Sequence, residues 1–154
     1  MKKIIAAGLC ALCLLLLCAC GRTGEDFSQM RGDFSADVRY AMGGVTYAAR
    51  YQKTDGDVTL TFTAPAGLCG CKLVRRGGET ALLRGELSVS VRGAAALPCA
   101  FFDFAPLNCR RTAEGYVFSD GERTYTVSAA GGVDKITLEC GDTRLSAAVD
   151  NICF

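Results

Sequence analysis

Apolar and polar side chains alternate along most of the chain after residue 33. The first alternating run spans residues 34–41, and two more span residues 45–51 and 58–64. In the first run the apolar positions are Phe34, Ala36, Val38 and Tyr40. Because successive side chains of a strand point to opposite faces, a period of two predicts half-buried strands. The Gly-containing segments between the runs predict tight turns, so the three strands should form an antiparallel meander with one apolar face.

The alternation returns later in the chain. Further strand-like runs occur at residues 71–74, 79–83, 87–91, 116–118, 124–128, 136–140 and 145–149. Together the runs predict a mainly β domain built on one antiparallel sheet of about eight to ten strands.

One segment does not alternate. Residues 97–106 have Pro98 near their start and Pro106 at their end, and prolines at these places typically mark the limits of a helix. Phe101 and Phe104 are three residues apart, so they would lie on the same helical face. We therefore expect one short helix of about two turns, laid over the apolar side of the sheet.

The first nineteen residues have the layout of a secretory signal peptide. Lys2 and Lys3 precede an apolar segment that runs from Ile4 to Leu17. The end of this segment, Leu17-Cys18-Ala19-Cys20 followed by Gly21, resembles the lipobox of bacterial lipoproteins. The resemblance implies that Cys20 receives diacylglycerol on its sulfur, that the chain is cleaved before it, and that labelled palmitate would be incorporated.

An uncleaved anchor helix and plain secretion are the two alternatives to lipidation at Cys20. The apolar stretch up to Cys20 is at the lower limit for a helix that spans a bilayer. We expect a signal peptide at 1–19, a tether at 20–33 and a single β domain at 34–154. The protein would then lie outside the cytosol, held by its lipid on the bacterial cell membrane.

The domain resembles small exported lipoproteins of clostridial-type bacteria, in the broader style of the lipoprotein carriers LolA and LolB. The resemblance is carried by FSADVRY at 34–40, VTYAARY at 45–51, DGDVTLTFTAP at 55–65 with Gly67-Leu68 behind it, and YTVSAAGGVDKITLE at 125–139. It implies that the sheet is strongly curved into a half-barrel and that the helix covers its concave face.

Six cysteines follow Cys20. They are Cys69, Cys71, Cys99, Cys109, Cys140 and Cys153. An even number in a small exported domain favours disulfides, and Cys99 with Cys109, which bracket the predicted helix, is the first expected pair. Buried free thiols are one alternative, and a soft metal or a redox role at Cys69-Gly70-Cys71 is the other. We expect no metal and no other cofactor, because zinc sites usually have two paired Cys motifs and this chain has one.

The composition excludes several classes of function. The chain has 154 residues, a formal net charge of +1 and no His. Catalytic arrangements that need His are therefore excluded, and there is no basic field to attract nucleic acid. The sequence has no phosphate-binding loop and no nucleophile elbow, so we expect a protein that is not an enzyme.

Two hypotheses for function remain. In the first, the concave apolar face binds a lipid or another hydrophobic ligand, and small residues on that face leave room for it. The ligand-binding residues would be Val38, Tyr47, Leu60, Phe62, Val89, Phe101 and Phe104. In the second, the protein's own side chains fill the same face, and the domain is a structural or protein-interaction module of the cell envelope. We expect a monomer in both cases.

Overall fold

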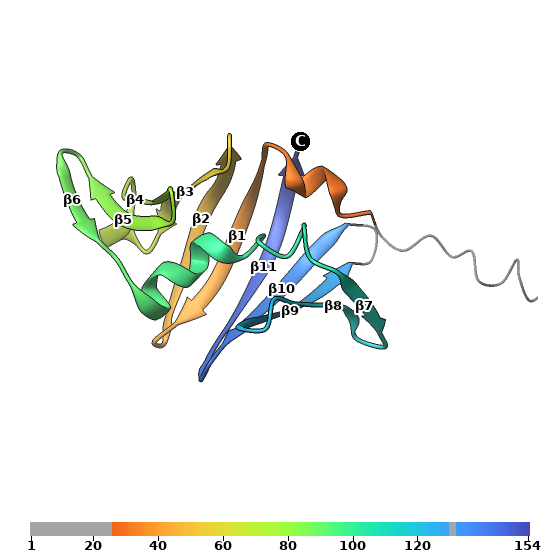
Figure 1. Ribbon diagram of the computed structural model, residues 1–154. Helices are drawn as coiled ribbons and strands as arrows, with labels where there is room; N and C mark the ends of the chain where they lie inside the picture. The colour runs from red at the N-terminus through yellow and green to blue at the C-terminus, as the bar shows by residue number, and fades with distance from the viewer. Residues whose placement is uncertain (1–25, 130–131) are drawn as a thin grey trace, which may run out of the picture.

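All strands of the computed structural model belong to one antiparallel sheet of eleven strands (Figure 1). The structure describes residues 26–129 and 132–154, so the predicted signal peptide and Cys20 lie outside the described residues. The strand order is β6-β5-β4-β3-β2-β1-β11-β10-β9-β8-β7. The chain thus starts in the middle of the sheet, builds one half outward, crosses to the far edge and builds the other half back to the middle.

The first half of the sheet consists of β1 (Phe34–Met42), β2 (Val45–Thr54), β3 (Asp57–Ala64), β4 (Lys72–Arg76), β5 (Glu79–Arg84) and β6 (Leu87–Ser90). The second half consists of β7 (Cys109–Thr112), β8 (Gly115–Ser119), β9 (Arg123–Ala129), β10 (Val133–Cys140) and β11 (Thr143–Cys153). The described part of the chain also has three short 3-10 helices: η1 (Ser28–Arg31), η2 (Ala66–Leu68) and η3 (Gly93–Ala100).

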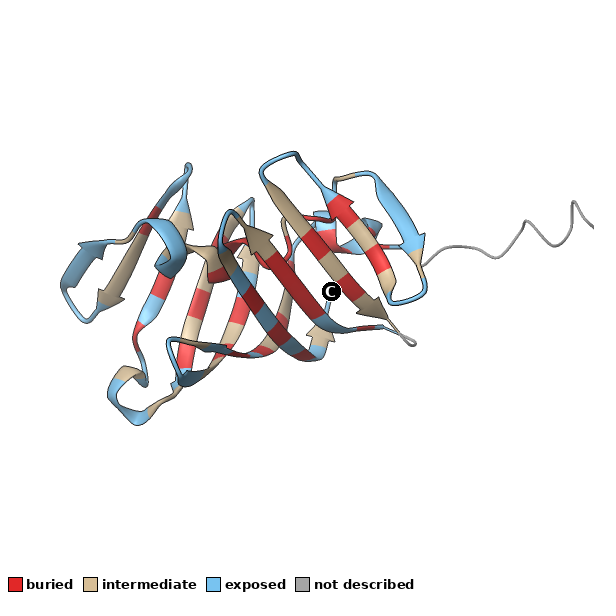
Figure 2. Cartoon of the chain, turned by 90° about the horizontal axis from the view of Figure 1, so that it is seen from below, coloured by how far each residue is buried: buried red, intermediate tan, exposed pale blue. Residues whose placement is uncertain are grey.

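The sheet is open and strongly curved, and its concave face holds the core (Figure 1). Buried and more exposed positions alternate along the central strands, as Figure 2 shows by colour. In β1 the buried positions are Phe34, Ala36, Val38 and Tyr40, the apolar face that the sequence predicts. The prediction of a mainly β, half-barrel domain is therefore confirmed, with eleven strands in place of about eight to ten.

Two glycine positions show how local sequence sets the strand connections. The β1–β2 turn has Gly43 at φ 59° and Gly44 at φ 77°, and positive φ at both central residues matches the twist of a two-residue hairpin. At the start of β8, Gly115 has φ 135°, and a Cβ there would collide with the carbonyl oxygen of Val127. β8 and β9 can therefore approach closely only because residue 115 has no side chain.

A single segment, residues 93–108, links β6 at one edge of the sheet to β7 at the other, and we call it the crossing segment. It begins with η3 and continues in turns to residue 107. Because it must pass from edge to edge, it runs across the concave face (Figure 1). Its fully buried aromatic side chains are Phe101, Phe102 and Phe104.

The predicted helix at 97–106 differs from the observed one in position and in type. The 3-10 helix begins earlier, at Gly93, and ends at Ala100 with Pro98 inside it. The turns that follow keep bonds between residues three apart, such as Asp103 N–H to the Ala100 carbonyl at 3.0 Å. Pro98 has no N–H to donate, and after it Phe101 packs on Tyr40 whereas Phe104 packs on Phe118, in the other half of the sheet.

The folded part of the chain begins before the first strand. Phe27 and Met30, which lie within the predicted tether, are buried in the core. The ring of Phe27 packs edge-on against Phe104, Tyr116 and Phe118, with centroid distances of 5.7, 5.2 and 5.3 Å. Within the described residues, no helix has the length and apolar character that crossing a bilayer requires.

Candidate functional site

One row of apolar side chains runs across the concave face from the centre of the sheet to its β6 edge. Residues directly opposite each other in antiparallel strands project from the same face. The successive partners in the row are Ala36, Tyr51, Leu60, Leu73, Leu82 and Val89. Tyr51 and Leu60 are fully buried, whereas Val89 is 61% exposed. The apolar face therefore extends beyond the area that the crossing segment covers.

The structure brings six of the seven predicted ligand-binding residues together. Five are buried in the core, and they are Val38, Leu60, Phe62, Phe101 and Phe104. Tyr47 is partly buried and packs on the core, with its ring stacked on Tyr40 at 5.1 Å. Val89 lies on the same face but apart from the others, on the exposed edge strand β6. The alternating sequence pattern identified correctly the face on which Val89 lies. The same pattern carries no information on how near its strand lies to the edge of the sheet.

The phenylalanines of the crossing segment fill the middle of the concave face. The ring of Phe102 lies 4.7 Å from that of Tyr51 and 5.0 Å from that of Phe34. Phe104 lies 4.8 Å from Phe118 on the other half of the sheet. Aromatic pairs at these separations add to the free energy of burial. The crossing segment thus replaces a second layer of structure over the sheet.

Asp103, in the crossing segment, is bound by arginines from both halves of the sheet. Arg75 of β4 donates two hydrogen bonds to its carboxylate, both at 2.6 Å. Arg123 of β9 donates a third at 3.1 Å and also pairs with Asp120 at 2.8 Å. The hydrogen bonds to Asp103 raise the pKa of Arg75 above its ordinary value. Sequence reasoning missed this cluster, because its members are brought together only by the curvature of the sheet.

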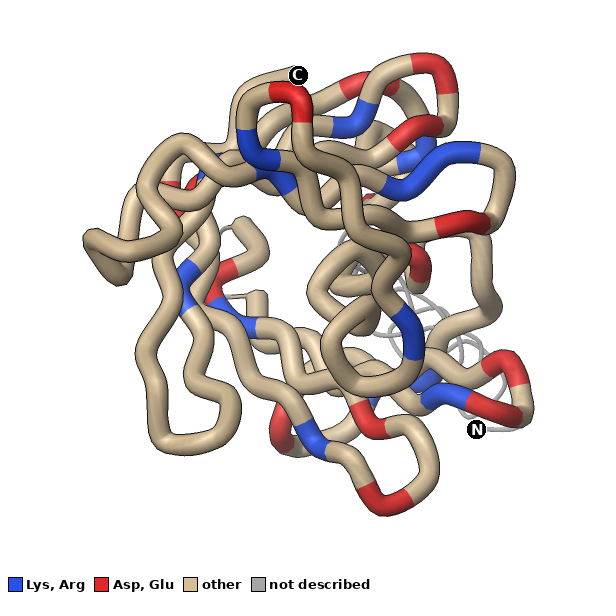
Figure 3. Tube along the Cα trace, turned by 90° about the vertical axis from the view of Figure 1, so that its left-hand side faces the viewer, with Lys and Arg blue, Asp and Glu red and all other residues tan. Residues whose placement is uncertain are grey.

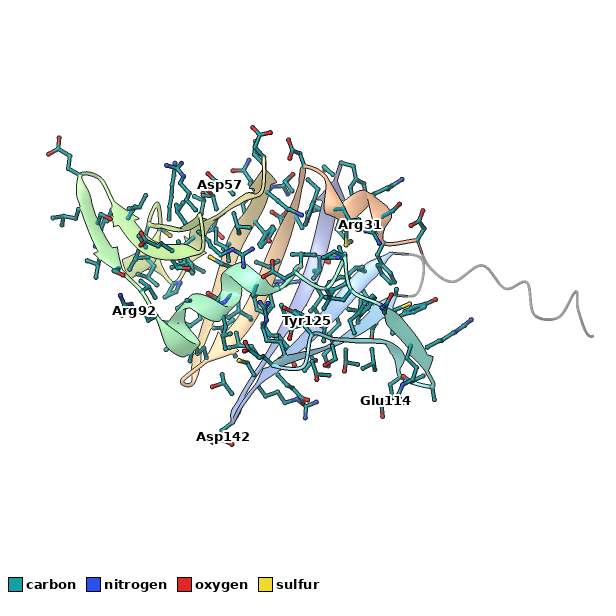
Figure 4. All side chains as sticks on the ribbon, viewed as in Figure 1. Arg31, Asp57, Arg92, Glu114, Tyr125 and Asp142 are labelled. Carbon is teal, nitrogen blue, oxygen red and sulfur yellow. The ribbon has the colours of Figure 1, made fainter. Side chains whose placement is uncertain are left out.

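Two tyrosine hydroxyls lie buried beneath the crossing segment. The Tyr51 hydroxyl donates a hydrogen bond of 3.4 Å to the carbonyl of Cys99. The Tyr125 hydroxyl has no hydrogen-bond partner among the described residues, and Figure 4 labels this residue in the middle of the sheet. Burial raises the pKa of both phenols, so both side chains are neutral at physiological pH. These two tyrosines therefore add no charge to the floor of the site, whose charged side chains are Arg75 and Arg123.

The six cysteines after Cys20 are free thiols in the structure. Cys99 is fully buried in η3, whereas Cys109 is exposed on the edge strand β7, and the expected bond between them is not formed. Cys69 instead donates a hydrogen bond to the carbonyl of Thr63 at 2.9 Å. The predicted disulfide framework is thus not seen, because the even count and the export signal say nothing of which thiols face one another. In residues 26–129 and 132–154, no three His, Cys, Asp or Glu side chains form a group that could hold a metal ion.

The comparisons with known proteins give similarities in structure alone. No protein-family model matches the sequence, and no curated protein matches it at a significant level. The structure is similar to that of a LolA superfamily protein from Nitrosomonas europaea, with 11% identity, a TM-score of 0.47, and coverage of 83% of this chain and 90% of that one.

Two further solved structures are similar to a comparable degree. One is an uncharacterised conserved protein from Thermus thermophilus, with 13% identity, a TM-score of 0.46, and coverage of 79% of this chain and 78% of that one. The other is a DUF1329 family protein from Desulfovibrio piger, with 11% identity, a TM-score of 0.44, and coverage of 84% of this chain and 90% of that one.

Replacing Asp103 should loosen the crossing segment. Asp103→Ala leaves Arg75 and Arg123 without their shared carboxylate, and we expect a loss of about 1–3 kcal/mol in the free energy of unfolding. The matched control is Asp57→Ala, which removes the partner of Arg76 in an exposed ion pair and should cost about 0.5 kcal/mol or less. Urea unfolding followed by circular dichroism measures both. Equal losses for the two variants would contradict the role given to Asp103.

The thiols should differ in reactivity according to burial. Burial raises the pKa of Cys99 to about 12, so at pH 8 almost none of it is the reactive thiolate. Iodoacetamide should therefore modify the exposed Cys109 in the folded protein and reach Cys99 only after unfolding. Mass spectrometry of unreduced protein gives the modified positions. Equal labelling of Cys99 and Cys109, or a disulfide joining them, would overturn this expectation.

Proposed function

We propose that this protein is a lipid-anchored, extracytoplasmic lipoprotein, not an enzyme, that binds one hydrophobic ligand such as an acyl chain on the concave face of its sheet. The observation that carries the proposal is the way this face is covered. One short crossing segment, and not a second sheet or a layer of long helices, lies over the apolar row. Binding requires that the segment moves aside and that the ligand takes the place of its aromatic side chains.

The free energies of such an exchange are of similar size. Exposing three buried phenylalanines costs about 5–9 kcal/mol, at about 1.5–3 kcal/mol for each side chain. An acyl chain that buries about ten methylenes regains about 8 kcal/mol. With ten methylenes the two terms nearly cancel, so net binding needs a longer chain: about sixteen methylenes would regain about 13 kcal/mol, exceed the cost by a few kcal/mol and bind reversibly.

The apolar face offers an entry route at the β6 side. Leu82 and Leu97 are partly buried where the face emerges from under the crossing segment. Beyond them Val89 and Leu87 are 61% and 71% exposed. Exposed apolar side chains that continue into a covered apolar face are typical of the mouths of hydrophobic sites. An acyl chain would first contact these residues.

A second candidate function has one specific observation in its favour. Phe101, Phe102 and Phe104 fill the middle of the face with aromatic contacts that need no ligand. If the crossing segment never leaves, the domain is a structural or interaction module of the cell envelope with its face permanently occupied.

Lipid binding can be tested on protein lacking residues 1–20. Lipid should co-purify with this protein and be seen by native mass spectrometry, and Phe62→Glu or Phe104→Glu should remove it by placing a charge on the apolar face. Thr61→Glu is the matched control, since Thr61 neighbours Phe62 on β3 and points to the opposite face, and it should keep the lipid.

Two further observations make this test decisive. Asp103→Ala should increase the amount of bound lipid, because the crossing segment is then held less firmly. Circular dichroism establishes which variants remain folded. An absence of lipid in the unmodified protein and in Asp103→Ala alike would favour the interaction module.

The anchor is tested separately at Cys20. Cys20→Ser should abolish incorporation of radiolabelled palmitate and leave the signal peptide attached, because only a thiolate supports the alkylation. Cys18→Ser is the control and should still be labelled. Label on the Cys20→Ser protein would show that the lipid is attached at another residue, and a lack of label on the unmodified protein would show that it carries none.

A further inference from the structure

The strand β6 forms an open edge of the sheet. It pairs with β5 on one side, and no strand of the described part of the chain pairs with its other side (Figure 1). Figure 3 views the molecule from this side, where acidic and basic residues are interspersed. All four residues of β6 are exposed. An exposed strand edge carries unpaired N–H and C=O groups that can pair with another strand.

The two edges of this sheet differ in chemistry. The edge strand β7 includes Arg110 and Arg111, both exposed, and charged side chains on an edge discourage pairing. By contrast, β6 reads Leu-Ser-Val-Ser and has neither a charge nor a proline. Its two apolar residues, Leu87 and Val89, are among the most exposed large apolar side chains of the described chain. Both edge strands are four residues long, and of the two only β7 carries charged side chains that oppose association.

The sequence around β6 is complementary to itself when it is read in opposite directions. Residues 86–92 are Glu-Leu-Ser-Val-Ser-Val-Arg, centred on Val89. If a second copy runs antiparallel with its Val89 opposite this one, serine meets serine and Leu87 meets Val91. At the ends, Glu86 meets Arg92 of the other copy, and this happens twice because the arrangement is symmetric.

The backbone of β6 fits the same register. The Val91 N–H donates to the carbonyl of Thr80 in β5 at 2.8 Å, so the main-chain N–H and C=O groups of Val91 point toward β5. Main-chain groups alternate in direction along a strand, so those of Val89 also point toward β5. The N–H and C=O groups of Ser88 and Ser90 point the other way, to the open edge. In the register centred on Val89, the outward groups of Ser88 lie opposite those of Ser90. Four main-chain hydrogen bonds could then form across the new junction.

We propose that two copies of this chain associate through their β6 edges, antiparallel and centred on Val89, to form one continuous sheet, in place of the monomer expected from the sequence. A shift of the register by two residues separates Glu86 from Arg92, and a parallel arrangement in register places Glu86 against Glu86. The proposed register alone combines both ion pairs with matched apolar and serine partners. It also joins the apolar rows of the two copies at Val89 and covers side chains that are exposed in the single chain. The pairing requires no ligand on the concave face.

The association is tested by exchanging the charges at the two ends of the strand. The full chain is purified in detergent, and its mass is measured by sedimentation equilibrium over a range of concentrations. The unmodified protein should be a dimer at the higher concentrations. Glu86→Arg and Arg92→Glu should each weaken the dimer at least tenfold, because each sets like charges opposite one another. The double variant Glu86→Arg with Arg92→Glu should restore the original dissociation constant.

The controls separate this interface from other modes of association. Arg110→Glu, on the β7 edge, should leave the dimer unchanged. Thermal unfolding by circular dichroism, at a concentration low enough for every variant to be monomeric, should give the same midpoint for all five proteins, since Glu86 and Arg92 are exposed. A chain that remains monomeric at every concentration would overturn the proposal. So would a dimer that the single charge reversals do not weaken.

A cross-link gives an independent measure of the register. Directly opposed residues in a pair without main-chain hydrogen bonds have Cα atoms about 4.5 Å apart, within the range of a disulfide. Val89→Cys should therefore join two copies on mild oxidation, and the linked peptide can be identified by mass spectrometry. Ser88→Cys is the control, because its counterpart in the second copy is Ser90. Equal cross-linking at both positions, or none at position 89, would contradict the register.

Discussion

The structure depends on covering one apolar face of a single curved sheet. Eleven strands lie in one layer, and burial of an apolar face is the main favourable term in folding. An open sheet has to bury this face against something, and here the crossing segment takes that role with Phe101, Phe102 and Phe104. Phe27 closes the face from the N-terminal side by packing on Phe104. The curvature of the sheet and the aromatic side chains on its concave face therefore both serve to bury this one apolar face.

The strand order explains why the cover is a single segment. The chain completes one half of the sheet at β6 and resumes at the opposite edge with β7, so residues 93–108 have to cross from edge to edge. Crossing over the concave face lets the same residues connect the halves and bury the core. Asp103 then joins the crossing segment to both halves of the sheet through Arg75 and Arg123. A cover held by side chains at a few points can leave more readily than one that shares the hydrogen bonds of the sheet.

Much of the fold could be predicted from the sequence, because strand alternation is a local property. The apolar face of β1 through Phe34 and Val38, and the turn at Gly43-Gly44, need no knowledge of distant residues. By contrast, β7 was missed because Arg110 and Arg111 interrupt any alternation. The exposure of Val89 and the meeting of Asp103 with Arg75 depend on strand order, which local patterns do not encode. The free thiols show the same limit, since counting cysteines does not place them in space.

The central claim is that the crossing segment can separate from the sheet while the sheet stays folded. Native-state hydrogen exchange measures this directly, because it gives the free energy of opening for each amide. We predict that the amides of Asp103 and Leu107, which bond within the segment, exchange through an opening of lower free energy than those of β1 and β2. Exchange of the segment and the central strands with one common free energy, that of global unfolding, would contradict the claim.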